Sequence, residues 1–265
     1  MRDGVVIESI GGPPHHMYRA YKTVGGEYSV VSPVGQDFDI WGDYRNDYMR
    51  FLEVFYGFDT LRFINEYTSS GRRQRVSGGG YQLSIVNTID FLERMLPEHV
   101  VVSPVYNEVS IKLVYTLSNL FNLSIDIQGF IREAVGDGFI IHRKFPEELY
   151  SISFHLFKLS SEESEYVDLD KVDAKYIVVT NGMEGATLVF EDSGYYIPAY
   201  PLTDVDETGS GDIFTYLFLH GLMKYSDAVD AACYASAYTS YILEGEGIEP
   251  QKRFKMVSEG VKQIR

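Results

Sequence analysis

Apolar runs of strand length alternate with helical patterns along most of this chain, and this alternation constrains the fold more than any other feature. Such strands and helices in alternation typically form a mostly parallel sheet covered by helices on both faces. We therefore predict an α/β fold, a three-layer α/β/α sandwich with a mostly parallel central sheet. Strand-like runs of β-branched and apolar residues occupy residues 4–10, 27–35, 60–67, 99–105, 123–130, 154–160, 175–182 and 186–192. Apolar residues at helical spacing occupy residues 39–57, 84–96, 108–122 and 161–172.

The last third of the chain changes to helical patterns. A long helix is expected from about Gly211, a second after Ser226, which we predict to be its N-cap, and a third in 251–265. Upstream, residues 132–145 predict a hairpin that turns at Gly-Asp-Gly. Residues 67–82 combine glycines, serines and three arginines, which fits a hairpin or a flap over a site as well as it fits a solvated loop.

Composition limits the organisation and the partners of the chain. We expect a single domain over residues 1–265, with a small lid within 1–10 and 60–80, because no repeat or linker interrupts the pattern. The formal net charge of −15 repels nucleic-acid phosphate and anionic lipid, so neither is an expected partner. Cys233 is expected in the core, and one cysteine permits no internal disulfide. We expect a cytoplasmic, soluble protein, since we see no signal peptide or membrane span.

The segment Asp-Glu-Thr-Gly-Ser-Gly-Asp, residues 206–212, stands directly before an apolar helix. Glycines at 209 and 211 let backbone amides approach a ligand, and the helix start favours an anion. Asp212 would then lie in the first turn, facing that anion. An ordinary helix start with an acidic first turn explains the same residues. The segment is neither a Walker A loop, since no Gly-Lys-Ser/Thr occurs in the chain, nor a dinucleotide fingerprint, since Phe214 replaces the third glycine.

Polar residues also gather at two other expected junctions. Asp126, Gln128 and Arg132 lie at the end of a predicted strand, where polar groups could bind a hydroxyl-rich substrate, although Arg132 also suits a surface salt bridge. Gly11 and Gly12 allow close approach of a ligand, ahead of a helix stiffened by two prolines. His15 and His16 follow them, as substrate contacts or, more commonly for such a pair, as capping or surface residues.

Taken as a whole, residues 206–212 resemble the signature of the ribokinase-like carbohydrate kinases, the phosphofructokinase-B family. Residues 178–214 resemble that family's strand, Gly-x-x-Gly turn, hairpin and signature in order. The Asn-x-x-Glu motif is matched by Glu163, with Ser160 in place of the asparagine, and residues 34–37 match Val-Gly-x-Asp. The resemblance spans roughly residues 11–245. Asp-x-Gln-Gly-x-x-Arg at 126–132, Lys-x-Ser-x-Glu-Glu at 158–163 and Thr-Asn-Gly at 180–182 look most like the myo-inositol kinase branch.

The resemblance implies a kinase that transfers a phosphoryl group from ATP or ADP to a sugar or a cyclic polyol. Asp212 would be the general base, and the backbone amides of Gly209, Ser210 and Gly211 would form the anion hole. Glu163 would act through Mg²⁺ and its waters, and Asp206 would hold a metal-bound water or cap its own turn. The nucleotide site would comprise Thr180, Gly182, Gly185 and Ser160, although Gly185 equally fits a tight turn. The substrate site would comprise Gly11, Gly12, Glu108, Asp126, Gln128 and Arg132, although Glu108 equally suits a first-turn helix glutamate.

Two alternatives to this function remain: a kinase of a nucleoside or another small alcohol, and a small-molecule-binding protein of the same fold that has lost catalysis. Family members carry a first strand with a substrate-binding aspartate well before the paired glycines. Here ten residues precede Gly11 and Asp3 is a poor substitute, so we expect the first strand and much of the lid to be missing, a reduced β lid. Either the chain start lies too late or this branch dispenses with that element. We expect a monomer or a homodimer.

Overall fold

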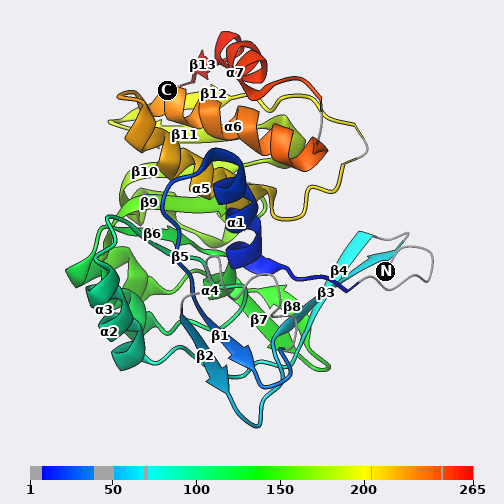
Figure 1. The fold of residues 1–265 in the computed structure, drawn as a ribbon, viewed down its shortest axis with the longest axis vertical. Coiled ribbons are helices and arrows are strands. Elements are labelled where there is room, and N and C mark those ends of the chain that lie inside the picture. The colour runs from blue at the N-terminus through cyan, green and yellow to red at the C-terminus, as the bar shows by residue number, and fades with distance from the viewer. Residues whose placement is uncertain (1–7, 39–50, 69–70, 204, 246, 265) are drawn as a thin grey trace. The chain divides into compact units, whose positions relative to one another are not determined.

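The computed structural model describes residues 8–38, 51–68, 71–203, 205–245 and 247–264 (Figure 1). The chain divides into two compact units. Unit 1 comprises Met1–Ile10 and Ser29–Ile152, and unit 2 comprises Gly11–Tyr28 and Ser153–Arg265. A short N-terminal segment therefore belongs to the same unit as the C-terminal half. The prediction of a single domain stays a prediction.

The strands of unit 2 form a mixed sheet. β9 (Ser153–Ser160) pairs in parallel with β10 (Asp173–Thr180), and the strands that follow, β11 (Ala186–Phe190), β12 (Ser193–Ile197) and β13 (Lys262–Gln263), pair antiparallel in turn. β9 is buried at most of its positions, as expected of a parallel strand covered on both faces. The predicted strands at 154–160, 175–182 and 186–192 are confirmed.

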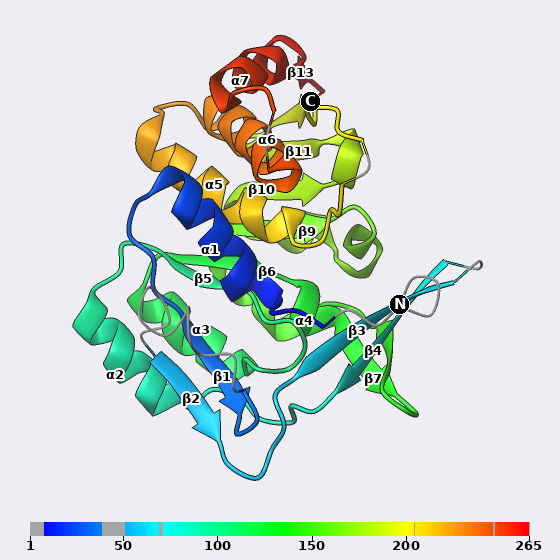
Figure 2. The ribbon, with the colours of Figure 1, turned by 45° about the vertical axis from the view of Figure 1, so that its right-hand side comes forward.

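Helices cover the sheet of unit 2. α1 (Gly12–Val24), α5 (Ser210–Lys224) and α6 (Ala228–Glu244) lie side by side against its strands in both views, and α7 (Pro250–Glu259) packs on α6 (Figures 1 and 2). α5 and α6 approach closely because Gly221 faces the backbone of Ala231. Cys233 is buried on α6, as expected. The N-cap of α6 is Asp227 and not Ser226, because the Asp227 carboxylate accepts hydrogen bonds from two first-turn amides.

The helix predicted over residues 161–172 is wrong. This segment forms two short 3₁₀ turns, η2 (Glu163–Tyr166) and η3 (Leu169–Lys171). Ser160 and Ser164 compete with helical backbone bonding: the Ser160 hydroxyl accepts from the Glu163 amide, and the Ser164 hydroxyl donates to the Ser161 carbonyl. Val167 between the turns is extended, which ends the first one.

Unit 1 combines short parallel pairs with a small antiparallel sheet. β1 pairs in parallel with β2 and β5 with β6, and the other four strands are ordered β3-β4-β8-β7. These strands are β1 (Val31–Gly35), β2 (Phe51–Phe55), β3 (Arg62–Thr68), β4 (Gly71–Ser77), β5 (Val100–Val102), β6 (Leu123–Asp126), β7 (Arg132–Val135) and β8 (Phe139–His142). The helices are α2 (Ile85–Met95), α3 (Ile111–Leu120), α4 (Gln128–Ile131) and the 3₁₀ helix η1 (Glu147–Ser151).

These elements test the sequence predictions in unit 1. The strand predicted over 123–130 is wrong at its end, because β6 stops at Asp126 and Gln128–Ile131 forms α4. The hairpin predicted over 132–145 is confirmed, since β7 pairs with β8. For residues 67–82 the sequence left a hairpin and a solvated loop open, and the structure has the hairpin, since β3 pairs with β4. The helix predicted over 39–57 is wrong at its end, where Phe51–Phe55 is a strand paired with β1. Residues 39–50 lie outside the described residues, as do residues 1–7, which include Asp3 and most of the predicted strand at 4–10. Among the described residues, no helix combines the length and apolarity needed to cross a membrane.

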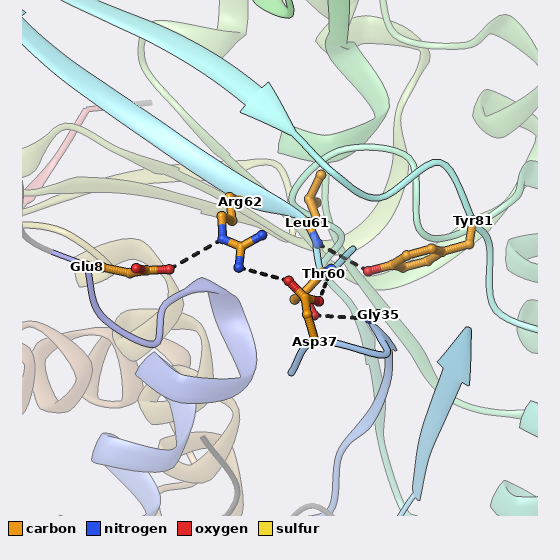
Figure 3. Close-up of polar contacts among 7 residues, drawn as sticks. All are labelled: Glu8, Gly35, Asp37, Thr60, Leu61, Arg62 and Tyr81. Carbon is orange, nitrogen blue, oxygen red and sulfur yellow. Dashed lines mark hydrogen bonds and ion pairs between the residues drawn. The ribbon is translucent and has the colours of Figure 1, made fainter. Parts of the chain in front are cut away.

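The Val-Gly-x-Asp segment anchors the start of β3 (Figure 3). A β-carbon at Gly35 would overlap the backbone of Asp59 and Thr60, so a side chain is excluded there. The Asp37 carboxylate accepts from the Thr60 amide at 2.5 Å and pairs with Arg62 at 2.8 Å. The Thr60 hydroxyl in turn accepts from the Gly35 amide at 3.1 Å. The motif thus has a structural role in unit 1.

Candidate active site

The signature segment forms the N-terminus of α5 in unit 2. Gly209 is the N-cap residue, and its φ of 79° lies in the left-handed region that favours glycine. The Ser210 amide already donates to the Glu207 carbonyl at 2.9 Å. The first amides of a helix have no partner within that helix. The amides of Gly209 and Gly211, which flank Ser210, are therefore the groups best suited to receive an anion.

Lys158 is a candidate site residue to which the sequence analysis gave no role. It lies on β9, is 6% exposed, and a β-carbon on Gly211 would lie 2.7 Å from its Nζ atom. A buried ammonium thus adjoins the first turn of α5, where the positive end of the helix dipole also lies. The signal was a lysine within the apolar run Phe-His-Leu-Phe-Lys-Leu-Ser. Lysine is rarely buried without a partner or a role.

Asp212 occupies the first turn of the same helix and is 8% exposed. Burial of a carboxylate is costly unless charges or hydrogen bonds compensate for it. The helix N-terminus favours a negative charge at this position. The structure therefore brings a buried acid, a buried lysine and glycine amides together within one unit, a combination that an ordinary helix start does not need.

Ser160 and Glu163 form two hydrogen bonds with each other at the end of β9. The Ser160 amide donates to the Glu163 carboxylate at 2.7 Å, and the Glu163 amide donates to the Ser160 hydroxyl at 3.3 Å. Glu163 is 7% exposed. Serine in place of the family's asparagine thus stabilises the turn that positions the glutamate.

The predicted nucleotide residues cluster at the ends of β9 and β10. Thr180 is the register partner of Ser160, so both lie at the carboxyl ends of parallel strands. Gly182 begins the 3₁₀ turn η4 (Gly182–Glu184), and a β-carbon there would lie 2.9 Å from the Glu207 carboxylate. Gly185 differs from these residues, since a β-carbon on it would overlap the Ile197 carbonyl and its φ is 99°. Packing and turn geometry therefore account for Gly185.

The two predicted metal residues do not form a closed metal cage. Asp206 caps its own turn by accepting from the Thr208 amide at 2.9 Å, and Glu163 accepts from Ser160. Among the described residues, no group of three or more His, Cys, Asp or Glu side chains is placed to hold a metal ion. Mg²⁺, however, usually keeps several waters and binds through one or two carboxylates together with substrate phosphates. That mode fits the two carboxylates present.

The paired glycines lie at the start of α1, in the same unit as α5. Gly11 is the exposed N-cap residue of α1, and a β-carbon on it would meet no atom of the described residues within 4 Å. Packing therefore does not explain this glycine, whereas close approach of a ligand would. Gly12 has a φ of 76°, and the two prolines occupy the first turn as expected.

The other predicted substrate residues lie in unit 1, around the loop that follows β5. The buried Asp126 accepts a hydrogen bond at 3.1 Å from the amide of Gln128, the first residue of α4. Glu108 accepts from the amides of Val105 and Tyr106 at 3.2 and 2.7 Å. Burial raises the pKa of Glu108, against the lowering effect of those backbone bonds.

Arg132 binds the same loop. Its guanidinium donates to the Val105 carbonyl at 2.7 Å and lies over the Phe63 ring at 4.6 Å from the centroid. These contacts make Glu108 and Arg132 supports of the 105–108 loop and show that Arg132 is more than a surface salt-bridge partner. Their role in substrate binding stays a prediction.

Comparison with solved structures identifies the fold. The chain superposes on a sulfate complex of a pyrophosphate-dependent kinase in the ribokinase family, with a TM-score of 0.76 and 21% identity over 94% of this chain and 92% of the other. An Arabidopsis thaliana ribokinase, in complex with ribose and ATP, superposes with a TM-score of 0.70 and 14% identity over 97% and 92%. The protein thus has the ribokinase-like α/β fold that the sequence predicts.

Sequence comparison adds a family model and curated relatives that match parts of the chain. Residues 152–251 match the pfkB family carbohydrate kinase model, which confirms the resemblance predicted from the sequence. The inositol 3-kinase of Zea mays is 30% identical over 146 residues, which are 53% of this chain and 38% of that protein. The nucleoside kinase of Methanothermobacter thermautotrophicus is 34% identical over 73 residues, 28% of this chain and 23% of that protein. The matches thus cover well under half the length of these curated relatives.

Proposed function

We propose that this protein is a kinase that transfers a phosphoryl group to a hydroxyl of a cyclic polyol, such as myo-inositol, or of a sugar. The observation that carries the proposal is the N-terminus of α5, where glycine amides, the buried Lys158 and the buried Asp212 adjoin. Phosphoryl transfer needs positioning, charge stabilisation and a proton acceptor, and this arrangement offers each of them.

In this proposal, the amides of Gly209 and Gly211 bind oxygens of the transferring phosphoryl group. Lys158 neutralises the charge that develops on those oxygens. Asp212 accepts the proton of the attacking hydroxyl as the oxygen–phosphorus bond forms and the donor's bridging oxygen departs. The buried setting strengthens these electrostatic interactions because water screens them less.

The phosphoryl donor in this proposal is ATP or ADP, with Thr180, Gly182 and Ser160 beside its phosphates. Glu163 and Asp206 would hold Mg²⁺ through its waters, and the ion would supply further neutralisation of the phosphates. Pyrophosphate is the alternative donor, because solved structures with this fold include a pyrophosphate-dependent kinase. The anion site at α5 serves either donor.

Two kinds of observation support the choice of acceptor: the matched relatives and the polar residues of the candidate substrate site. Inositol 3-kinases are among the matched relatives, and a related solved structure contains myo-inositol and a pyrophosphate analogue. We assign the polar residues Asp126, Gln128, Glu108 and Arg132 of unit 1 to substrate hydroxyls. Gly11 of unit 2, where a β-carbon would meet no atom of the described residues within 4 Å, is assigned to close approach of a ligand. A nucleoside acceptor is the second candidate, which the match to a nucleoside kinase favours.

A product screen tests this proposal. The purified protein is incubated with Mg²⁺, one donor among ATP, ADP and pyrophosphate, and one acceptor among inositols, pentoses, hexoses and nucleosides, and products are identified by mass spectrometry. We expect an inositol phosphate. A product from nucleosides but not from inositol would replace the acceptor, and no product from any pair would favour a binding protein of the same fold.

A further inference from the structure

His16 lies against the N-cap residue of α5. It belongs to α1, is 8% exposed, and its ring packs on Gly209 so closely that a β-carbon at residue 209 would overlap the Cγ and Nδ1 atoms. Gly209 is therefore required for two reasons, its positive φ and this contact. In the adjacent pair His15 and His16, it is the ring of His16 that supplies the atoms nearest to a β-carbon at Gly209.

The Nδ1 atom of His16 is buried and has no hydrogen-bond partner among the described residues. Buried polar groups are almost always paired, so an unpaired ring nitrogen beside a helix N-terminus points to a missing partner. Burial, followed by the neighbours His15 and Arg19, lowers the pKa of His16 to about 4 against the opposing effect of Asp206. The imidazole is thus neutral at neutral pH, and one of its nitrogens carries a proton.

We propose that His16 belongs to the anion site and that its Nδ1–H group donates a hydrogen bond to an oxygen of the phosphoryl group held by the α5 amides. This inference rests on the proposed function, because it takes the anion to be a phosphoryl group. The donor is already desolvated and fixed against Gly209, so it needs little reorganisation when the ligand binds. A neutral donor also leaves the charge balance between Lys158 and Asp212 unchanged.

Two substitutions distinguish the contributions of the two ring nitrogens of His16 to binding. The amide nitrogen of His16→Asn lies close to the position of Nδ1, whereas that of His16→Gln reaches the position of Nε2. Affinity for inorganic pyrophosphate in the presence of Mg²⁺ is measured by calorimetry. We expect His16→Asn to bind within about threefold of the wild type and His16→Gln to bind roughly tenfold more weakly, the usual effect of losing one hydrogen bond to a charged group.

His15→Gln is the matched control, because His15 is the neighbouring histidine of the same helix and none of the three atoms nearest to a β-carbon at residue 209 belongs to it. Its affinity should equal that of the wild type. Melting temperatures show whether each variant folds. If a His16 variant does not fold, the ¹⁵N shift of Nδ1 in the wild-type protein replaces it, and we expect that shift to respond to pyrophosphate. Equal affinity of wild type, His16→Asn and His16→Gln, or an unresponsive Nδ1, would overturn the inference.

The binding assay does not depend on turnover, which keeps the two proposals separable. Pyrophosphate binding that depends on His16, without product from any acceptor, would support the inference and overturn the kinase function. Product formation with unchanged affinity in His16→Gln would overturn the inference alone.

Discussion

The ammonium group of Lys158 lies 2.7 Å from the position that a β-carbon on Gly211 would occupy. A strand residue and a helix residue separated by more than fifty positions in the sequence therefore share one site. The absence of a side chain at 211 leaves room for the lysine beside the first turn of α5. Packing against Lys158, and not a special backbone conformation, therefore explains why glycine occupies position 211.

Gly211→Ala should reduce activity while leaving the fold intact. The added methyl group displaces a flexible lysine end, so the free energy of unfolding should change by less than about 1 kcal/mol, since alanine also favours the helix. Turnover should fall at least about tenfold because a displaced charge no longer stabilises the transition state. Initial rates and thermal unfolding, measured on the same preparation, check both expectations.

Gly221→Ala, in the same helix, is the opposite control. Its β-carbon would lie 3.0 Å from the Ala231 Cα atom, between packed helices. We expect destabilisation of about 1–3 kcal/mol from overpacking and unchanged turnover per folded molecule. If Gly211→Ala behaves like Gly221→Ala, the lysine contact has no part in catalysis.

Asp212→Asn should lower turnover by about 10²–10⁴-fold, the usual contribution of a general base, while donor binding survives. The substitution keeps the size of the side chain and removes its capacity to accept a proton. Single-turnover rates and donor affinity measure the two effects separately. Near-normal turnover would remove Asp212 from the role of base.

Asp37 should make the stability of unit 1 sensitive to acid. Hydrogen bonds from Thr60, followed by those from Arg62, lower the pKa of Asp37 from 3.8 to about 2. Because the folded pKa is depressed, the stabilisation is complete above the unfolded pKa and is lost as the pH falls from 3.8 to about 2. The difference in melting temperature between wild type and Asp37→Asn should therefore shrink across this interval.

Thr60→Val provides the check on this prediction. It removes the hydroxyl group that contributes to the lowered pKa of Asp37 and keeps the backbone amide. The acid-dependent loss of stability should then be smaller than in the wild type and be complete at a higher pH, because the folded pKa of Asp37 is less depressed. A melting difference between wild type and Asp37→Asn that stays constant from pH 7 to pH 2 would contradict the assignment.

Arg253 should be among the most sensitive residues of unit 2 in stability measurements. It is completely buried, pairs with Glu244, and donates to the Ile248 carbonyl and the Ser240 hydroxyl. Its guanidinium also lies 4.5 Å from the centre of the Tyr200 ring. Arg253→Lys retains the charge but loses the planar fork, so we expect a loss of about 2 kcal/mol in the free energy of unfolding. Denaturant titration measures this loss, and a change below 0.5 kcal/mol would contradict it.

The sequence by itself determined the local elements and the signature. Period-two and helical patterns located most strands and the long helices, because burial of one face leaves a repeat in the sequence. The 161–172 segment departed from its pattern because serine side chains bonded the backbone locally, and the strand at 51–55 formed because β1 offered it a partner. Gly209 was informative because few residues other than glycine adopt its positive φ.

Only the tertiary structure decided which distant residues adjoin the signature. Lys158 reads as one polar position in an apolar strand, and His16 as one of two histidines in a helix, until β9 and α1 pack against α5. Spacing along a chain carries no information on such contacts, because they depend on how separate elements dock. The acid and the amides of the candidate site were therefore visible in the sequence, whereas its lysine and its histidine emerged from the packing of unit 2.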